Sequence, residues 1–458
     1  MNRININIVG KWMEFLNDFI SVFISYLFTR AIFGLPFINS FTCFIYICIN
    51  MIVLTMMGAY DDLCSYTTQK KRFPITAAVS LVISLASNII IYFLIGKGDV
   101  LSPGGYAFLY FFAYAIIIFG RQIILNILLH FVKKQTLLII FSKGYPDTFL
   151  NKLKKDAVDF GDVRFCELYE ASVEKRVLEE IDKSDQVLLL SNVDDWLRDK
   201  YLLHAFEQGK TAKILPTVEN LVMLGGAITH IGDTPVIGIK NNRLPFLDAV
   251  LKRSFDFIAA LAGLVILSPV FLLCAAAIKI DSPGPVFYLQ ERYTIYKKRF
   301  NIIKFRTMVE DAESGGARLA TENDSRITRF GAVLRACRLD ELPQLINILK
   351  GEMSLVGPRP ERPMYADEYS MMVKNYDIRY MMKAGLTGYA QIYGQYNTKV
   401  SDKVLFDSIY INNFSVWLDF KLILQTVMIM FVKESTEGVE ENMAKVPDGR
   451  EKDGAKSL

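Results

Sequence analysis

The sequence is poor in the residues that build disulfide frameworks, zinc centres and histidine-based sites. It has six cysteines in 458 residues, and none of them forms a CxxC pair. Most of the cysteines lie in apolar segments, and the three histidines, His130, His204 and His230, are scattered along the chain. This pattern argues against a disulfide framework and a zinc site, and we expect the histidines to be structural.

A strong excess of one charge is also missing. The chain has 52 Lys and Arg against 48 Asp and Glu, a formal net charge of +4, so we expect no nucleic-acid partner. The N-terminus does not resemble a signal peptide, because it carries little charge, enters a long apolar run and has no cleavage site of small residues. We therefore expect the first apolar stretch to be retained.

Apolar residues, by contrast, are abundant. They make up 52% of the chain and the mean hydropathy is +0.26, which is too apolar for an ordinary soluble protein. Four apolar stretches fill the first part, each close to the roughly 20 residues that span a bilayer. They run near 13–33, 38–58, 74–96 and 105–132. We predict a four-helix transmembrane bundle over residues 1–134.

The loops around these stretches predict their orientation. Basic residues gather before the first stretch, between the second and third, and after the fourth: Arg3, Lys11, Lys70, Lys71, Arg72, Lys133 and Lys134. The alternate loops carry only Arg30 and Lys97. Both ends of the bundle are therefore predicted to face the cytoplasm.

One charge falls inside a predicted span. Arg121 lies within the fourth apolar stretch, and an ionisable residue inside a membrane is a functional candidate. The long side chain can also extend to the interface and leave its charge in water. We favour the second interpretation.

Residues 135–245 alternate between strand and helix patterns. Apolar runs typical of buried strands occur at Thr136–Phe141, Gln186–Leu190 and Ala212–Leu215, with helical patterns such as Val173–Ile181 and Trp196–Gln208 between them. This alternation predicts a small, parallel, Rossmann-like α/β domain. After the first strand there is no GxGxxG, and Pro146 stands where the phosphate-binding turn would be, so we do not expect dinucleotide binding. We predict a regulatory or dimerising role, and a homodimer.

The apolar segment 254–280 decides where the rest of the chain lies. It contains Ser268-Pro269 near its middle, and a proline kinks a helix. A kinked spanning helix is one interpretation. The other is a re-entrant helix, because both flanks are basic and so both prefer the cytoplasmic side. The Ser268 hydroxyl would then satisfy a carbonyl that the proline frees. We favour re-entry.

Residues 301–308 (NIIKFRTM) read as a strand. At a period of two, Lys304 and Arg306 share one face and Phe305 takes the other. Two cations on one face suit a diphosphate, but for this motif taken alone a solvated strand face is the favoured interpretation.

Asp340-Glu341-Leu342-Pro343 reads as the start of a helix that ends at Gly351. Asp340 is then simply an N-cap. The same placement also suits chemistry, since a helix N-terminus favours phosphate and keeps a carboxylate ionised. Asp340 would attack phosphorus while Glu341 holds Mg²⁺, with Arg335 and Arg338 adding positive charge.

Residues 354–363 (SLVGPRPERP) form a proline-rich loop around Arg359. Arginine binds phosphate in a bidentate manner, although a surface arginine on a structural turn is the simpler alternative. Glu352 is a candidate to orient an arginine or to join the metal site.

From about Lys252 to Phe431 the chain resembles the bacterial sugar transferases, polyprenyl-phosphate phosphoglycosyl transferases with one re-entrant membrane helix. The resemblance rests on Lys252-Arg253, Ser268-Pro269, Gly284–Phe287, Gln290–Arg292, Lys304–Met308, Leu339–Gln344, Ser354–Pro360 and Gly385–Gly388. The motifs are short, but their order is specific. The whole chain looks like the long form that initiates capsule, exopolysaccharide or O-antigen synthesis at the bacterial inner membrane.

The resemblance implies roles for particular residues. The family's nucleophilic aspartate, the glutamate of its magnesium site and its phosphate-binding arginine fall on Asp340, Glu341 and Arg359. The lysine of its KFR motif falls on Lys304, and its helix-breaking pair on Ser268-Pro269. We therefore count Lys304, Arg306, Arg335, Arg359 and Glu352 as substrate-binding candidates, with UDP-sugar and undecaprenyl phosphate as substrates.

Two departures from the family pattern stand out. Glycines usually separate the QER and KFR motifs, whereas this chain has Tyr293–Arg299 there, which predicts a differently shaped strand connection. A later motif that usually reads like TGxAQVNGR is here Thr387–Gln395 (TGYAQIYGQ). The second departure leaves the identity of the sugar open.

The predicted architecture therefore has four parts. The bundle (1–134) and the α/β domain (135–245) precede a cytoplasmic α/β catalytic domain (246–432) with its re-entrant helix at 254–280. Residues 433–458 are mostly charged or small and are predicted to form a disordered tail.

The predicted reaction has two steps. Asp340 attacks the β-phosphorus of a UDP-sugar and UMP leaves, and undecaprenyl phosphate then takes the sugar phosphate from the aspartyl intermediate. A membrane channel with a nucleotide-sensing domain is one alternative, and the missing GxGxxG weighs against it. A non-catalytic assembly scaffold is another, and the intact Asp340, Glu341 and Arg359 weigh against that.

Overall fold

The computed structural model describes residues 3–33, 40–60, 66–95, 103–131, 136–142, 147–156, 162–168, 174–190, 193–231, 234–239, 245–309, 324–394 and 398–429. The predicted tail of 433–458 lies outside these ranges, as do Lys97, Lys133, Lys134 and Pro146. The chain divides into two compact units, Met1–Thr217 and Val218–Leu458.

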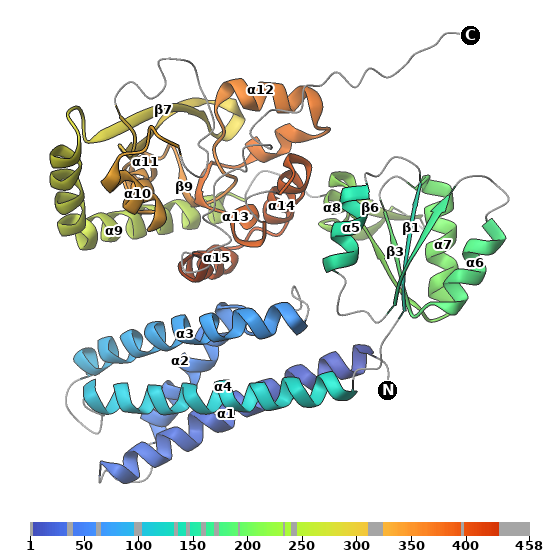
Figure 1. Ribbon diagram of the computed structural model, residues 1–458, viewed down its shortest axis with the longest axis horizontal. Helices are drawn as coiled ribbons and strands as arrows, with labels where there is room; N and C mark the ends of the chain where they lie inside the picture. The colour runs from blue at the N-terminus through green and yellow to red at the C-terminus, as the bar shows by residue number, and fades with distance from the viewer. Residues whose placement is uncertain are drawn as a thin grey trace. The chain divides into compact units, whose positions relative to one another are not determined.

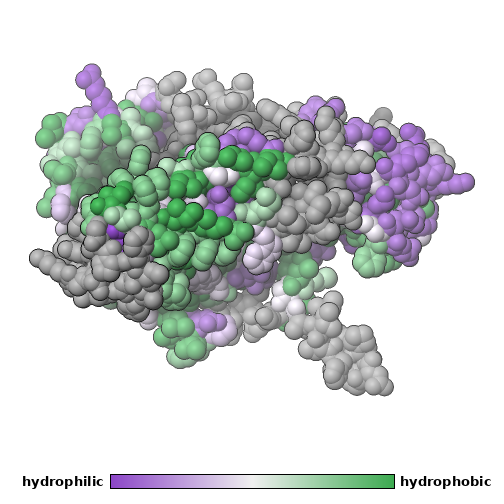
Figure 2. Space-filling model, turned by 90° about the horizontal axis from the view of Figure 1, so that it is seen from below, coloured by the Kyte–Doolittle hydropathy of each residue, from purple (hydrophilic) through white to green (hydrophobic). Residues whose placement is uncertain are grey.

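Four helices open the first unit (Figure 1): α1 (Arg3–Ile32), α2 (Ser40–Met56), α3 (Tyr66–Ile95) and α4 (Pro103–Phe131). They fall on the four predicted apolar stretches. Helices α1, α3 and α4 each contain a segment long and apolar enough to cross a membrane, whereas the apolar part of α2 is shorter. Figure 2 shows hydrophobic side chains gathered over these helices.

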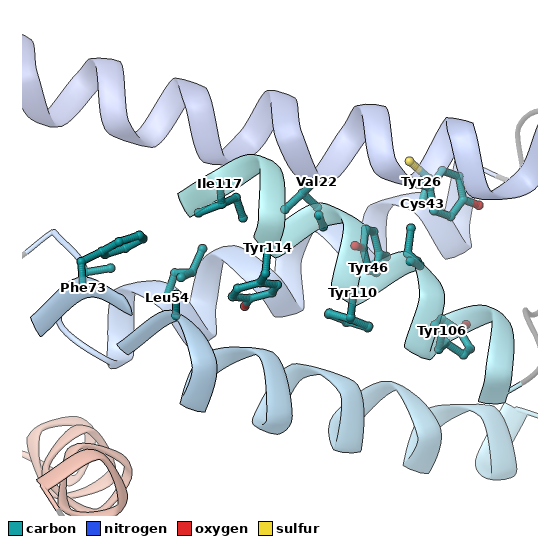
Figure 3. Packing of buried hydrophobic residues seen from close by; sticks show 14 residues of the cluster. Val22, Tyr26, Cys43, Tyr46, Leu54, Phe73, Tyr106, Tyr110, Tyr114 and Ile117 are labelled. Atoms are coloured by element: carbon teal, nitrogen blue, oxygen red, sulfur yellow. The ribbon is translucent and has the colours of Figure 1, made fainter. Parts of the chain in front are cut away.

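Tyrosines and asparagines share the interior of the bundle. Figure 3 shows Tyr46, Tyr110 and Tyr114 within the hydrophobic cluster, and the rings of Tyr46 and Tyr110 lie 5.2 Å apart. The side-chain amide of Asn50 donates a hydrogen bond to the Tyr110 hydroxyl at 3.2 Å, and Asn88 donates to the same oxygen. These bonds satisfy polar groups that would otherwise be costly to bury in an apolar environment.

Arg121 does not extend to the interface, so the favoured prediction for it was wrong. Its side chain is buried, and its Nε lies 3.1 Å from both carboxylate oxygens of Asp18 on α1. Its Nη1 donates to the Ala59 carbonyl at 3.0 Å and lies 3.4 Å from Glu14. A buried charge is stable only with such partners, and the sequence pattern had not indicated that α1 supplies them.

The first unit also contains a parallel sheet in the order β2-β1-β3-β4. Its elements are β1 (Thr136–Ser142), α5 (Asp147–Asp156), β2 (Asp162–Leu168), α6 (Glu174–Lys183), β3 (Gln186–Leu189), α7 (Asp195–Glu207) and β4 (Thr211–Ile214). Central strand β1 is buried on both faces, as an apolar strand in a parallel sheet should be. The predicted separate α/β region with a parallel sheet is confirmed.

The second unit begins before residue 246, where the sequence had placed the start of the catalytic domain. Helix α8 (Val218–Leu224) belongs to this unit, as does the antiparallel hairpin of β5 (Ala227–Ile231) and β6 (Thr234–Gly238). Val218 and Val222 of α8 pack against the cluster that contains Tyr376 and Val404. Glu219 pairs with Lys374 at 2.7 Å.

Helix α9 (Phe246–Asp281) is the most apolar long helix and contains Pro269. Figure 1 draws it as two limbs that run in different directions, which is what a proline inside a helix produces. Pro269 cannot donate to the carbonyl of Val265, four residues earlier. The Ser268 hydroxyl donates to that carbonyl at 2.8 Å, as predicted.

The first limb of α9 is bound to the second unit by charged side chains. Lys252 Nζ donates to Asp419 Oδ2 at 2.6 Å and to the Val356 carbonyl at 3.1 Å. Asp256 accepts a hydrogen bond from the Leu355 amide at 3.0 Å. Arg253 donates to the Ile348 and Leu349 carbonyls, at 2.6 and 2.7 Å.

The far end of α9 is bound to the same unit. Cys274 and Ile278 pack in one cluster with Phe305 and Leu334. Asp281 Oδ2 accepts a hydrogen bond from the Phe330 amide at 3.0 Å. Both ends of this 36-residue helix therefore contact one compact unit.

The rest of the second unit is a set of short elements packed around α11 and two small sheets. Strands β7 and β8 are antiparallel, and β9 and β10 are parallel. The elements are β7 (Phe287–Tyr293), η2 (Ile295–Lys297), β8 (Arg299–Phe305), α10 (Arg329–Ala336), η3 (Leu339–Glu341), α11 (Gln344–Lys350), β9 (Ser354–Val356), α12 (Pro363–Met372), η4 (Tyr376–Met381), β10 (Gly385–Thr387), α13 (Tyr389–Tyr393), α14 (Val400–Asn412) and α15 (Val416–Ile429).

We expect Asp419→Asn to lower the free energy of unfolding of the second unit by about 3 kcal/mol, because the amide leaves the Lys252 ammonium buried without its anion. Chemical denaturation in detergent measures the change. Glu291→Gln is the matched control, since it breaks an exposed pair with Arg299 and should cost less than about 0.5 kcal/mol. Equal losses of unfolding free energy in the two variants would contradict this account of the buried Lys252–Asp419 pair.

Candidate active site

Asp340 and Glu341 lie in a 3₁₀ turn, η3, and not at the N-terminus of the following helix. Arg338 enters this turn in a left-handed conformation, with φ of 54°, and α11 begins only at Gln344. The predicted N-cap role of Asp340 was therefore wrong. Pro343 explains the split, because its ring and missing N–H disfavour an α-helical turn before it. The predicted end at Gly351 is confirmed by its φ of 83°.

Glu341 is held by two cations that come from distant parts of the sequence. Lys304 Nζ lies 2.9 Å from Glu341 Oε1, and Arg359 Nη2 lies 2.7 Å from the same oxygen. Burial alone would raise the pKa of Glu341, but Arg359 and Lys304 hold it well below its usual range. Glu341 is therefore an anion that joins β8 and the proline-rich loop to the η3 turn.

Asp340 has a different environment from its neighbour. Its pKa is raised by burial and by the adjacent Glu341 carboxylate, while Lys304, Arg335 and Arg359 oppose the rise. Within the described residues these groups act on it through space, without a hydrogen bond to its carboxylate. A carboxylate that is surrounded by cations but not bound by them can reach an electrophile.

The two other predicted cations, Arg335 and Arg306, are each held by groups outside this pair of carboxylates. Arg335 Nε donates to Thr307 Oγ1 at 2.8 Å, and its charge acts on Asp340. Arg306 is buried, and it donates to the Ser282 and Pro283 carbonyls, both at 2.7 Å. Strand β8 ends at Phe305, so Arg306 no longer follows the alternation that placed it beside Lys304. Its contact with a diphosphate stays a prediction.

Glu352 contacts neither Glu341 nor the arginines in the described part of the chain. Its Oε2 accepts a hydrogen bond from Asn347 Nδ2 at 2.7 Å. Asn347 also accepts from the Ile303 amide at 3.0 Å and donates to the Asn301 carbonyl at 2.8 Å, which fixes α11 on β8. The predicted role of Glu352 at a metal ion or an arginine stays a prediction.

The sequence predicts a magnesium ligand at Glu341. Among the described residues there is no group of three or more His, Cys, Asp and Glu side chains that could hold a metal ion. Magnesium, however, is often bound through one or two carboxylates together with substrate phosphates. Both cations on Glu341 use Oε1, and this leaves Oε2 for such a ligand.

The backbone of the Arg359 loop is held by buried groups that the sequence analysis did not select. Arg379 Nη2 donates to the Arg359 carbonyl at 3.1 Å, and Arg379 is itself paired with Asp407 at 3.1 Å. A single aspartate in the otherwise apolar helical pattern LFDSIYI was the available signal for Asp407. At the start of the loop Gly357 has no room for a side chain, since a Cβ would lie 2.3 Å from the Lys383 carbonyl.

The match to a known protein family lies within the second unit. The family model for bacterial sugar transferases matches residues 247–433. A UDP-N-acetylgalactosamine-undecaprenyl-phosphate N-acetylgalactosaminephosphotransferase of Aeromonas hydrophila is 41% identical over 182 residues, which are 39% of this chain and 43% of that protein. A UDP-glucose:undecaprenyl-phosphate glucose-1-phosphate transferase of Escherichia coli (strain K12) is 36% identical over 259 residues, 55% of this chain and 56% of that protein.

The alignments thus span about half the length of these two relatives. A shorter relative is matched almost completely. The exopolysaccharide production protein PSS of Rhizobium leguminosarum bv. phaseoli is 41% identical over 201 residues, which are 42% of this chain and 98% of that protein. Together with the family model, this match shows that the chain belongs to the bacterial sugar transferase family.

Proposed function

We propose that this chain transfers a sugar 1-phosphate from a UDP-sugar to undecaprenyl phosphate, releasing UMP and giving an undecaprenyl-diphosphate sugar. The observation that carries the proposal is the pair of adjacent carboxylates in η3. Glu341 is fixed by Lys304 and Arg359, and the Asp340 carboxylate beside it has no hydrogen bond or ion pair to another described residue. The printed names of the relatives from Aeromonas and Escherichia describe reactions of this class.

The first step uses Asp340 as the nucleophile. One carboxylate oxygen forms a bond to the β-phosphorus, and the bond from that phosphorus to the oxygen bridging the two phosphates breaks. UMP leaves with the electron pair of that bond, and the sugar phosphate stays on the aspartate as an acyl phosphate. Covalent catalysis of this kind divides one difficult transfer into two easier ones.

In the second step a phosphate oxygen of undecaprenyl phosphate attacks the same phosphorus. The acyl phosphate bond breaks and Asp340 returns as a carboxylate. Lys304, Arg335 and Arg359 surround the position with positive charge, which favours the charge that develops on the transferred phosphoryl oxygens. Glu341 is the residue that would hold Mg²⁺, and a bound ion neutralises phosphate charge.

The membrane geometry proposed here is a re-entrant α9 with the second unit on the cytoplasmic side of the bacterial inner membrane. A straight helix of 36 residues would be about 54 Å long, enough to carry its ends to opposite sides of a bilayer. Both ends instead contact one compact unit, through Lys252 at the first and Asp281 at the second. Those contacts and the bend at Pro269 support re-entry, and the basic flanks support the cytoplasmic side.

The pathway and the assembly belong to the same proposal. The exopolysaccharide production protein of Rhizobium leguminosarum, matched over almost its whole length, supports a first membrane step in exopolysaccharide, capsule or O-antigen synthesis. For the parallel-sheet domain we propose a Rossmann-like regulatory or dimerising role within a homodimer. In the described residues after β1 the chain offers no glycine-rich turn for a phosphate.

We expect Asp340→Asn to abolish UMP release from UDP-sugars in the presence of undecaprenyl phosphate, because an amide cannot act as the phosphorus nucleophile. The measurement is UMP release by purified protein in nanodiscs. Asp367→Asn is the matched control, since it changes an aspartate of the same unit, bound to Tyr293, and should retain turnover. Near-normal turnover by a folded Asp340→Asn protein would falsify the covalent role.

We expect a cysteine at the exposed position Lys298 to be inaccessible from the periplasm. The variant is Lys298→Cys in a background that lacks the six native cysteines, labelled in intact cells with a membrane-impermeant maleimide. Lys97→Cys, in a loop that the charge pattern assigns to the periplasm, should be labelled. Labelling at position 298 equal to that at 97 would mean that α9 spans the membrane.

We expect residues 218–458 to carry out the transfer without the first unit. Helix α8 is retained because it packs against Tyr376 and Val404, so a fragment that begins at 246 should be less stable. The rate per folded molecule in nanodiscs should be within about tenfold of the full chain. A folded fragment that binds UDP-sugar but transfers nothing would show that the first unit contributes to the chemistry.

A further inference from the structure

A half-buried arginine and a buried one hold consecutive carbonyls of the loop that carries Arg359. Arg379 Nη2 donates to the Arg359 carbonyl at 3.1 Å, and Arg292 Nη1 donates to the Pro360 carbonyl at 3.2 Å. They come from different elements, η4 and β7. The backbone from which the Arg359 side chain extends is thus held by two separate parts of the unit.

Arg379 is the more deeply buried of the two and has the fuller set of partners. Its residue is 3% exposed, and its Nη2 lies 3.1 Å from Asp407 Oδ2 on α14. Its Nη1 donates to the Tyr376 hydroxyl at 2.7 Å and lies 4.0 Å from Glu361. A guanidinium can bind a carbonyl, a carboxylate and a hydroxyl at once because its five N–H donors point in fixed directions.

A pair buried this deeply is poor evidence for stability alone. Removing two charges from water is costly, and an apolar pair of similar volume is often as stable. Burial raises the pKa of Asp407 to about 6, with Arg379 opposing the rise and Glu361 adding to it. The geometry gives the pair a second consequence. The Nη2 that lies beside Asp407 also donates to the Arg359 carbonyl, which belongs to neither η4 nor α14.

The side chain of Arg359 points in a direction that depends on this backbone. Its guanidinium is partly exposed, and its Nη2 lies 2.7 Å from Glu341 Oε1. If the Arg359 peptide rotated, the Cα–Cβ bond of Arg359 would point in another direction. The guanidinium would then move away from Glu341.

We propose that Arg379, held by Asp407, is a positioning residue that directs Arg359 to Glu341 and, on the proposed function, to the diphosphate of the nucleotide sugar. Arg379 does not touch substrate in this account. It acts through the peptide of Arg359, so its contribution to catalysis exists only while Arg359 is an arginine.

A double-mutant cycle tests this dependence. The variants are Arg379→Gln, Arg359→Gln and the pair, and the readout is kcat/KM for UMP release from the full chain in nanodiscs. Each single change should lower kcat/KM about tenfold or more, as expected for loss of a charged hydrogen bond. The double variant should match Arg359→Gln alone. Losses that multiply would overturn the proposal, since a general structural defect costs the same in either background.

A second measurement does not depend on turnover. Arg359 held against Glu341 should react slowly with phenylglyoxal, and mass spectrometry of its peptide gives the rate. Arg379→Gln and Asp407→Asn should each accelerate that reaction several-fold. Arg379→Lys keeps the charge but loses the planar set of N–H donors, so its rate should fall between those variants and the wild type. An unchanged rate in folded Arg379→Gln protein would overturn the proposal.

The control is Arg299→Gln, which removes an exposed arginine paired with Glu291 in the same unit and should leave both readouts unchanged. If the wild-type chain releases no UMP from any UDP-sugar, the proposed function fails by itself. The modification rate of Arg359 then still decides whether Arg379 positions it.

Discussion

The attachment of both ends of α9 to one folded unit is the constraint on which the rest of the second unit depends. Lys252 and Asp256 hold the first limb against β9, and Asp281 holds the far end against α10. The strand that Lys252 and Asp256 contact leads directly into the proline-rich loop of Arg359. Helix α9 and the loop that carries Arg359 therefore share one anchor. On the proposed function, this anchor would keep the site near the lipid headgroups, where a polyprenyl phosphate would present its phosphate.

Charge is distributed unequally between the two adjacent carboxylates of η3. Glu341 takes both nearby cations on one oxygen, and Asp340 feels the same cations without being bound by them. If Lys304 and Arg359 bound Asp340 instead, two charged bonds would have to break before its carboxylate could act as the proposed nucleophile. Glu341 thus holds both cations and leaves the Asp340 carboxylate free of them, an arrangement that two neighbouring residues in a 3₁₀ turn can provide.

Local patterns predicted the elements whose causes are local. The apolar stretches, the alternating strand and helix patterns, the Ser268 hydrogen bond at Pro269 and the end of α11 at Gly351 all follow from neighbours a few residues apart. One error arose where a distant residue decides, and the other where two residues close to the site set its backbone. Arg121 was expected at the interface because Asp18, 103 residues away, cannot be recognised as its partner from the sequence. Asp340 was expected to cap a helix, but the left-handed Arg338 and Pro343 isolate its turn.

The same device recurs in three parts of the chain. A buried cation is paired with an aspartate far away in the sequence: Arg121 with Asp18, Lys252 with Asp419, and Arg379 with Asp407. Such pairs add little net stability, because the cost of leaving water offsets most of their attraction. They do penalise every arrangement in which one partner is buried alone. Each pair therefore selects one placement of two elements. These are α1 against α4, α9 against α15, and α14 against η4, the turn that carries Arg379. On the proposed function, a site that keeps two carboxylates, several cations and a lipid phosphate in register benefits more from such selectivity than from additional apolar contacts.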